Sequence, residues 1–195
     1  MNFLAHAYLS FNDPEILVGN MVSDFVKGSA RFGFSGKIQK GIMLHREIDS
    51  FTDVHPATKE AKQIFRPAYR LYSGAIMDVI YDHFLATDPD IFDERSLKLF
   101  THNTYIQLEQ NAPSLPNNFI HVLSFMKMED WLFHYRFKEG ISKSLKGLVR
   151  RAVYLSESDT AFRLFQDEYS TLQSCYEEFF PDVKEFAKER FELLK

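Results

Sequence analysis

Histidine and aspartate side chains recur among apolar residues in three segments of the first 85 residues, at 19–25, 45–53 and 78–84. A carboxylate among apolar side chains is costly to bury unless a cation or hydrogen-bond donors compensate it. Three such segments in succession, with histidine interleaved, therefore predict a bound divalent metal.

The clearest set lies in the segment 36–54, which has helical spacing. At about 100° per residue, His45, Asp49 and Asp53 share one face, with successive members one turn apart. The same spacing of four residues recurs in three other pairs: Asn2 and His6, Asn20 and Asp24, and Asp78 and Asp82. The last pair lies on a segment that is apolar nearly all round, which is typical of a buried helix.

Imidazole and carboxylate ligands together suit Mn, Fe, Zn or Ni. A single cysteine, Cys175, excludes a cysteine-based zinc site. A mixed nitrogen and oxygen ligand set with open positions suits hydrolysis, because the metal lowers the pKa of a bound water and neutralises charge on a phosphoryl oxygen.

Simpler roles are open for most of these side chains. His6 could be a satisfied core histidine, and Asp53 could cap the helix that follows it. Three other pairs could be plain ion pairs or hydrogen bonds: Asp24 with Lys27, Arg46 with Asp49, and Asp82 with His83. The remaining histidines are interpreted as structural: His55, His102, His121 and His134.

Helical spacing dominates the chain, and no stretch alternates cleanly at period two. We expect helices near 2–10, 14–27, 36–54, 57–66, 73–86, 94–110, 117–138, 141–155 and 158–193. Asp13-Pro14 supplies an N-cap and a proline at the first helical position. No repeat or linker divides the chain, so the predicted fold is all-α, one helical bundle domain over residues 1–195.

The totals exclude several classes of protein. The composition of 45% hydrophobic and 26% charged residues is that of a soluble globular chain. A net charge of -4 gives no general basic field for nucleic acid. No run approaches the roughly 18 apolar residues of a membrane span, and no signal peptide is visible. Together with the lone cysteine, these features predict a cytoplasmic protein.

One region stands out against the negative total. The segment Arg136–Arg151, called the basic strip below, carries six basic residues and one acidic residue. It could be the solvated face of a helix, or it could dock an acidic partner. For docking, the candidate contacts are Lys143, Lys146, Arg150 and Arg151.

A set of short motifs runs in order through nearly the whole chain and is densest before residue 86. It comprises Met1-Asn2-Phe3-Leu4-Ala5-His6, Gly19-Asn20, Ser23-Asp24-Phe25-Val26-Lys27-Gly28, Gly41-Ile42, His45-Arg46-Glu47-Ile48-Asp49, Thr52-Asp53, Met77-Asp78-Val79 and Asp82-His83-Phe84-Leu85. In these motifs the chain resembles the acyl-carrier-protein phosphodiesterase (acyl-carrier-protein hydrolase) family.

The resemblance implies a fold related to the HD phosphohydrolases and a manganese-dependent phosphodiesterase, with Mg²⁺, Fe²⁺ or Zn²⁺ as alternatives. The reaction implied is removal of 4′-phosphopantetheine from holo acyl carrier protein, which leaves the apo form. The usual contiguous His-Asp pair is missing, because Asp82-His83 is reversed and His45 is separated from Asp49. The expected metal ligands are His6, Asp24, His45, Asp49, Asp82 and His83.

The resemblance also associates Asp24 with catalysis. Arg46 and Lys27 lie beside the metal candidates and could hold the non-bridging phosphate oxygens. The partner expected is the acidic carrier protein, with neither nucleic acid nor a membrane involved. Two alternatives stay open: an HD-type phosphohydrolase of a small nucleotide or phosphopantetheine compound, and a non-enzymatic helical interaction module with a buried ion-pair network.

Overall fold

The computed structural model describes residues 1–194, and every regular element in this range is helical. The α-helices are α1 (Phe3–Tyr8), α2 (Pro14–Val22), α3 (Gly36–Val54), α4 (Pro56–Tyr69), α5 (Ser73–Thr87), α6 (Glu94–Gln110), α7 (Asn117–Met128), α8 (Trp131–His134), α9 (Lys138–Arg151), α10 (Asp159–Asp167) and α11 (Tyr169–Leu194). Four short 3₁₀-helices join them: η1 (Ser23–Phe25), η2 (Gly28–Gly33), η3 (Arg70–Tyr72) and η4 (Ala112–Ser114). The all-α prediction is confirmed.

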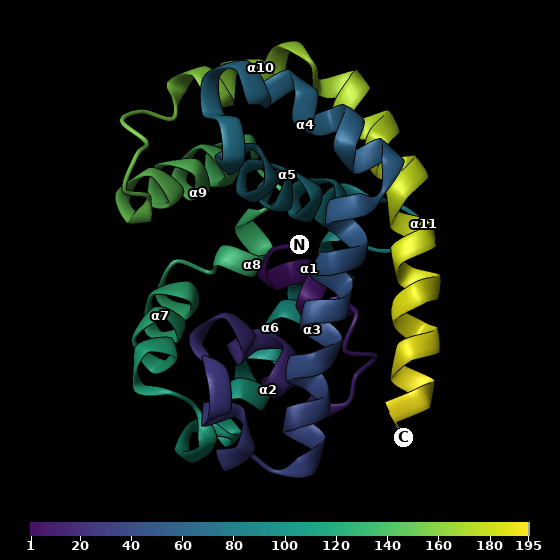
Figure 1. Ribbon diagram of the computed structural model, residues 1–195, viewed down its shortest axis with the longest axis vertical. Coiled ribbons are helices and arrows are strands. Elements are labelled where there is room, and N and C mark those ends of the chain that lie inside the picture. Colours follow the sequence, from purple (N-terminus) through teal and green to yellow (C-terminus); the bar gives the residue numbers. More distant parts are fainter. Residues whose placement is uncertain (195) are drawn as a thin grey trace.

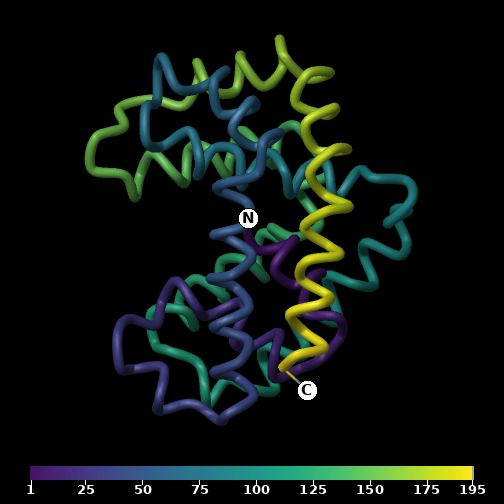
Figure 2. The backbone as a smooth tube through the Cα atoms, turned by 45° about the vertical axis from the view of Figure 1, so that its right-hand side comes forward, coloured from purple at the N-terminus to yellow at the C-terminus, as the bar shows by residue number. Residues whose placement is uncertain are grey.

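Two long helices run side by side and connect the two ends of the molecule. Helix α3 packs against α2 at one end and leads into α4 at the other, while α11 packs along both α3 and α4 (Figures 1 and 2). The Lys40 ammonium donates to the carbonyl of Leu194, which ties the start of α3 to the end of α11. The amino terminus lies in the middle of the molecule, between α3 and α8 in Figure 1.

Two glycines let α2 and α3 approach closely. A Cβ atom at Gly19 would lie 2.1 Å from the carbonyl oxygen of Ile38, and one at Gly41 would lie 2.4 Å from that of Ile16. Neither contact is possible for a larger residue without a backbone shift. The pair therefore sets how the end of α2, which leads into Asp24, lies against α3.

Several predicted boundaries are confirmed. The Asp13 side chain accepts hydrogen bonds from the backbone N–H groups of Glu15 and Ile16 and caps α2, with Pro14 at the first helical position. Helices α3 and α6 occupy the predicted ranges 36–54 and 94–110. The helix predicted from residue 73 to 86 also begins at Ser73.

Three of the predicted helices are interrupted, and those predictions were wrong. The range 14–27 ends as an α-helix at Val22 and continues as η1, and the range 158–193 divides at Glu168. The range 117–138 divides at Asp130, whose φ of 45° lies in the left-handed region. Aspartate tolerates that region better than most residues. Apolar residues have helical spacing on both sides of Asp130, so the spacing alone predicts one continuous helix.

The buried apolar side chains form one hydrophobic core cluster. Aromatic rings contribute much of it, and Tyr81 of α5 stacks on Phe179 of α11 with ring centroids 4.7 Å apart. Within residues 1–194, no helix combines the length and the apolar character needed to cross a membrane.

Candidate metal centre

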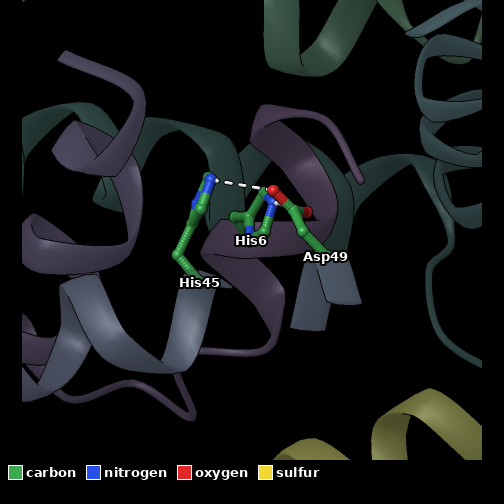
Figure 3. A group of neighbouring side chains, drawn as sticks. All are labelled: His6, His45 and Asp49. Carbon is green, nitrogen blue, oxygen red and sulfur yellow. Dashed lines mark ion pairs between the residues drawn. The ribbon is translucent and has the colours of Figure 1, made fainter. Parts of the chain in front are cut away.

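Three side chains from two helices converge beside the amino terminus. His6 of α1 and His45 and Asp49 of α3 each offer one ligand atom, and these atoms all lie within 4.8 Å of one another. Figure 3 shows both imidazoles beside the Asp49 carboxylate. The Nε2 atoms of His6 and His45 lie 3.2 Å and 3.1 Å from its two oxygens. No other group of this kind occurs within residues 1–194.

The α3 members meet because they are one turn apart on the same helical face. His6 is brought to them by the way α1 is held. The Asp82 carboxylate of α5 accepts hydrogen bonds from the backbone N–H groups of Leu4 and Ala5, at 2.8 Å and 3.1 Å. These groups belong to the first turn of α1 and have no partner within the helix. Asp82 therefore anchors the start of α1 and, through it, His6.

The orientation of His45 is set by a backbone group. Its Nδ1–H donates to the carbonyl of Asn20 at 2.8 Å, which directs Nε2 toward Asp49 and Asp24. The Asp24 carboxylate lies 3.2 Å from the same Nε2. A backbone carbonyl that holds one imidazole nitrogen while the other faces a cation is the usual arrangement around a metal-bound histidine.

His6 is the polar group in the core that most clearly needs a partner. Both of its ring nitrogens are buried, and neither makes a hydrogen bond of acceptable geometry. Its ring stacks on that of His45, with centroids 3.8 Å apart and planes inclined by 16°. A buried polar atom without a hydrogen bond is rare and calls for an explanation, and a bound ion would supply one here.

The two histidines have opposite pKa shifts. Burial and the neighbouring His45 lower the pKa of His6 to about 4, so its imidazole is neutral at pH 7 and ready to bind a cation. Burial acts against the charged form of His45 too, but the Asp24 and Asp49 carboxylates outweigh it and raise that pKa to about 9. A divalent ion at this position would replace the proton that His45 holds between the two carboxylates.

The carboxylates of the cluster are ionised at neutral pH. Burial acts against ionisation of Asp49, but the Met1 amino group and the two histidines hold its pKa well below the usual range. The hydrogen bond with His45 lowers the pKa of Asp24. The side chain of Asp24 is 75% exposed, so substrate and water can reach it.

A cationic group lies next to the cluster and adds a residue that the sequence did not single out. The Met1 amino group is 3.1 Å from Asp49 and 2.9 Å from Asp78, a partner from α5. Burial raises the pKa of Asp78, and the amino group opposes that shift. The sequence pairs Asp78 with Asp82 by their spacing of four, but Asp78 is not among the six expected ligands. A carboxylate on an otherwise apolar helix indicates a buried ionic partner, and this feature could have identified Asp78 from the sequence.

Two of the six expected ligands are engaged elsewhere. Both oxygens of Asp82 cap α1, as described above. The ring of His83 makes two hydrogen bonds, from Nδ1 to the Tyr135 carbonyl at 2.7 Å and from Nε2 to the Tyr169 hydroxyl at 3.0 Å. The structure brings neither side chain to the cluster, because each is held by these other partners. Their mutual hydrogen bond is not formed either.

The cationic candidates lie on the exposed side of the centre. Arg46 donates to the carbonyl of Val26 at 3.2 Å instead of pairing with Asp49. Lys27 is exposed in the segment after Asp24. Asp53 pairs with Lys62 at 2.7 Å, so the simpler role proposed for it, capping the next helix, is not what it does.

The basic strip falls mainly on α9, which is amphipathic. Ile141 and Leu145 are buried, and the four candidate contacts are exposed on the other face: Lys143, Lys146, Arg150 and Arg151. Arg136 is engaged with Glu94 at 3.2 Å. In Figure 1, α9 is at the upper left, on the opposite side of the molecule from α11.

Taken together, the donor set is two imidazole nitrogens and one carboxylate, with a second, exposed carboxylate beside them. Such a set fits a divalent ion that keeps open positions for water and substrate. The buried imidazole of His6 is the structural observation that favours this fit, because its Nε2 faces the Asp49 carboxylate at 3.2 Å without a hydrogen bond of acceptable geometry.

Comparisons with known proteins agree with the motifs. The profile of the family described as acyl carrier protein phosphodiesterase matches residues 1–183. Curated proteins of the same name are similar over 191 residues, which is 97% of this chain. The protein from Photorhabdus laumondii is 32% identical with 96% of its length covered, that from Enterobacter sp. strain 638 is 32% identical with 99% covered, and that from Yersinia enterocolitica is 31% identical with 99% covered.

No solved structure matches the chain. The predicted relation to the HD phosphohydrolase fold therefore stays a prediction, while the family assignment rests on sequence similarity over nearly the full length.

Proposed function

The chain belongs to the acyl carrier protein phosphodiesterase family, and we propose that it is a metal-dependent phosphodiesterase acting on holo acyl carrier protein. The reaction proposed is hydrolysis of the phosphodiester that joins 4′-phosphopantetheine to the carrier protein, which yields the apo form. The single observation that carries the metal-dependent part is the convergence of His6, His45 and Asp49.

These three residues would hold the ion, which we propose to be Mn²⁺ in preference to Mg²⁺, Fe²⁺ or Zn²⁺. When bound, the ion would supply a water of lowered pKa and neutralise charge on the phosphoryl group. His45 is positioned for this role by Asn20, and His6 by the α1 anchor at Asp82. Asp82 and His83 are not part of the ligand set proposed here.

Asp24 is proposed to orient the attacking water and to accept its proton. It is ionised, exposed and within hydrogen-bond distance of His45, so a water near the centre can reach its carboxylate. It could also complete the ligand set from the open side. Either role makes its charge necessary for the reaction.

Arg46 and Lys27 are proposed to hold the non-bridging oxygens of the phosphodiester. Arg46 is tied to the Val26 carbonyl, which keeps its guanidinium next to the segment that carries Asp24. A planar guanidinium suits two oxygens of one phosphate. Lys27 is a more mobile point charge on the exposed side.

The basic strip is proposed to dock the carrier protein. Its exposed cations on α9 would attract an acidic partner and guide the phosphodiester toward the metal centre. We also propose a cytoplasmic setting, because the lone Cys175 is free and buried and fits a reducing compartment.

The deciding experiment is a mass assay of purified holo carrier protein. Loss of the phosphopantetheine mass should require the protein, stop with EDTA and return with Mn²⁺. Turnover of a small phosphodiester without turnover of the carrier protein would favour the small-molecule phosphohydrolase. Failure to bind metal at all would favour the interaction module, with the cluster as a buried ion-pair network.

A further inference from the structure

A cavity of about 570 Å³ lies between η2, η4 and the start of α3, and its wall includes the two residues that follow Asp24. Its walls include Glu15, Phe25, Val26, Ala30, Ile38 and Ser114. That volume is in the range of small-molecule binding sites. In Figures 1 and 2 the segments around it lie at the lower end of the molecule, on the same side as α9.

The lining is neutral apart from one residue. Glu15 is the only charged side chain in it, and its carboxylate is already engaged by the Ser35 hydroxyl at 2.7 Å. Phe34 and Leu115 provide apolar surface, while hydroxyl and amide groups are interspersed among the other wall residues. Such a lining favours an uncharged chain that carries both alkyl and amide groups, and it disfavours a phosphate.

The cavity is continuous with the candidate metal centre along the chain. Phe25 and Val26 form part of its wall and directly follow Asp24, whose carboxylate contacts His45. On α3, Ile38 lines the cavity seven residues before His45. At 1.5 Å of rise per residue, this separation is about 10 Å along the helix axis.

We propose that this cavity binds the pantetheine arm of the substrate while its phosphate lies at the metal centre. The inference rests on the proposed function. Pantetheine is uncharged, has two amides, a hydroxyl and two methyl groups, and ends in a thiol. Its backbone equals about four residues in length, or roughly 13 Å when extended, which spans the separation between the two sites.

The assignment also explains the division of charge in this region. The cationic candidates Arg46 and Lys27 and the anionic Asp24 lie at the centre, where the phosphodiester reacts. Charged groups are scarce in the cavity, where the neutral arm would lie. A phosphopantetheine compound has the same distribution, with its charge at one end.

A tryptophan substitution in the cavity wall tests this proposal, with the same substitution at a neighbouring position outside the cavity as the control. Ala30→Trp adds bulk at the wall of the cavity, whereas Ser29→Trp adds the same group at an exposed neighbour that does not line it. We expect kcat/KM on holo carrier protein to be about tenfold lower for Ala30→Trp than for Ser29→Trp. Melting temperature and metal content should match in the two variants. Should Ala30→Trp fail to fold, Ser114→Trp narrows the opposite wall.

Binding of free pantetheine separates this inference from the proposed reaction. Saturation-transfer NMR should detect reduced pantetheine on the wild type and on Ser29→Trp, and its signal should vanish with Ala30→Trp. This pattern supports the cavity assignment even if the wild type does not hydrolyse the holo carrier protein. The absence of hydrolysis would contradict the proposed function but not the cavity assignment. Equal binding to all three proteins, or equal kcat/KM for the two variants, overturns the cavity assignment.

Discussion

The imidazole of His6 lies flat against that of His45, with ring centroids 3.8 Å apart, although the two residues come from different helices. One ring is neutral at pH 7 and the other holds a proton between two carboxylates. Both Nε2 atoms face Asp49. If the two imidazoles bind a metal ion, its uptake would release the proton that His45 holds, whereas His6 would have none to release.

The first prediction concerns His45 as a metal ligand. His45→Ala should lower metal affinity and turnover about a hundredfold or more, because it removes the nitrogen that Asn20 orients toward the cluster. Elemental analysis and the holo-to-apo mass assay measure the two effects. His121→Ala, at an exposed histidine of α7, is the matched control and should keep both values. Normal metal content in His45→Ala would remove this residue from the site.

The second prediction separates the charge of Asp24 from its shape. Asp24→Asn should fold normally and lose about a hundredfold or more in kcat, because the neutral amide cannot accept a proton from water. The pKa of His45, followed by NMR in the metal-free protein, should also fall, since Asp24 helps to raise it. Asp53→Asn, whose side chain pairs with Lys62 at the surface, should keep full activity. Near-normal kcat in Asp24→Asn would leave it only a structural role.

The third prediction tests docking on the basic strip. Lys143→Glu combined with Lys146→Glu should raise KM for the carrier protein and reduce the salt dependence of kcat/KM, because an attractive surface becomes repulsive. Both residues are exposed, so the free energy of unfolding should change by no more than about 0.5 kcal/mol. The same reversal at Lys184 and Lys188 on α11 changes the net charge equally on another face. Equal changes in KM and in salt dependence for the two double variants would show that the basic strip is only a solvated helix face.

The fourth prediction concerns the close approach of α2 and α3. Gly19→Ala should lower the free energy of unfolding by about 2–3 kcal/mol, because its Cβ would lie 2.1 Å from the Ile38 carbonyl oxygen. Gly147→Ala in α9 meets no atom within 4 Å and should instead add about 0.5–1 kcal/mol. Chemical denaturation measures both changes. A neutral Gly19→Ala would mean that the two helices can move apart at little cost.

The fifth prediction follows from the buried carboxyl of Asp82. Burial raises its pKa from 3.8 to about 7, against the two backbone N–H groups that favour the charged form. Between these values the native state binds a proton that the unfolded chain has lost, so stability falls as pH rises from about 4 to about 7. Above pH 7 both states are ionised, and the contribution of Asp82 stays constant.

Asp82→Asn should therefore flatten the pH dependence of the free energy of unfolding across that window. Above pH 7 the variant should also be less stable than the wild type, by about 1–3 kcal/mol, because there the ionised carboxylate accepts from two N–H groups whereas the amide offers one acceptor. Urea unfolding at a series of pH values provides the comparison. Parallel curves for wild type and variant would contradict the raised pKa.

Much of the local structure could be predicted from the sequence, because helical geometry depends on neighbouring residues. The apolar period predicted α3 and α5, the Asp13-Pro14 pair predicted the start of α2, and the spacing of four placed His45 and Asp49 on one face. The motifs identified the family, which the comparisons confirm. The turn at Asp130 was not predicted, because a single residue in the left-handed region does not change the spacing of the apolar residues.

Tertiary structure decided which residues form the candidate metal centre. His6, Asp82 and His83 look alike in the sequence, each a polar residue in an apolar helix, yet only His6 reaches the cluster. A buried carboxyl group can be paired with a cation or with the free N–H groups of a helix terminus, and Asp82 takes the second option. Which option applies depends on where α1 packs against α5. The spacing of residues within each helix does not determine how two helices distant in sequence pack together.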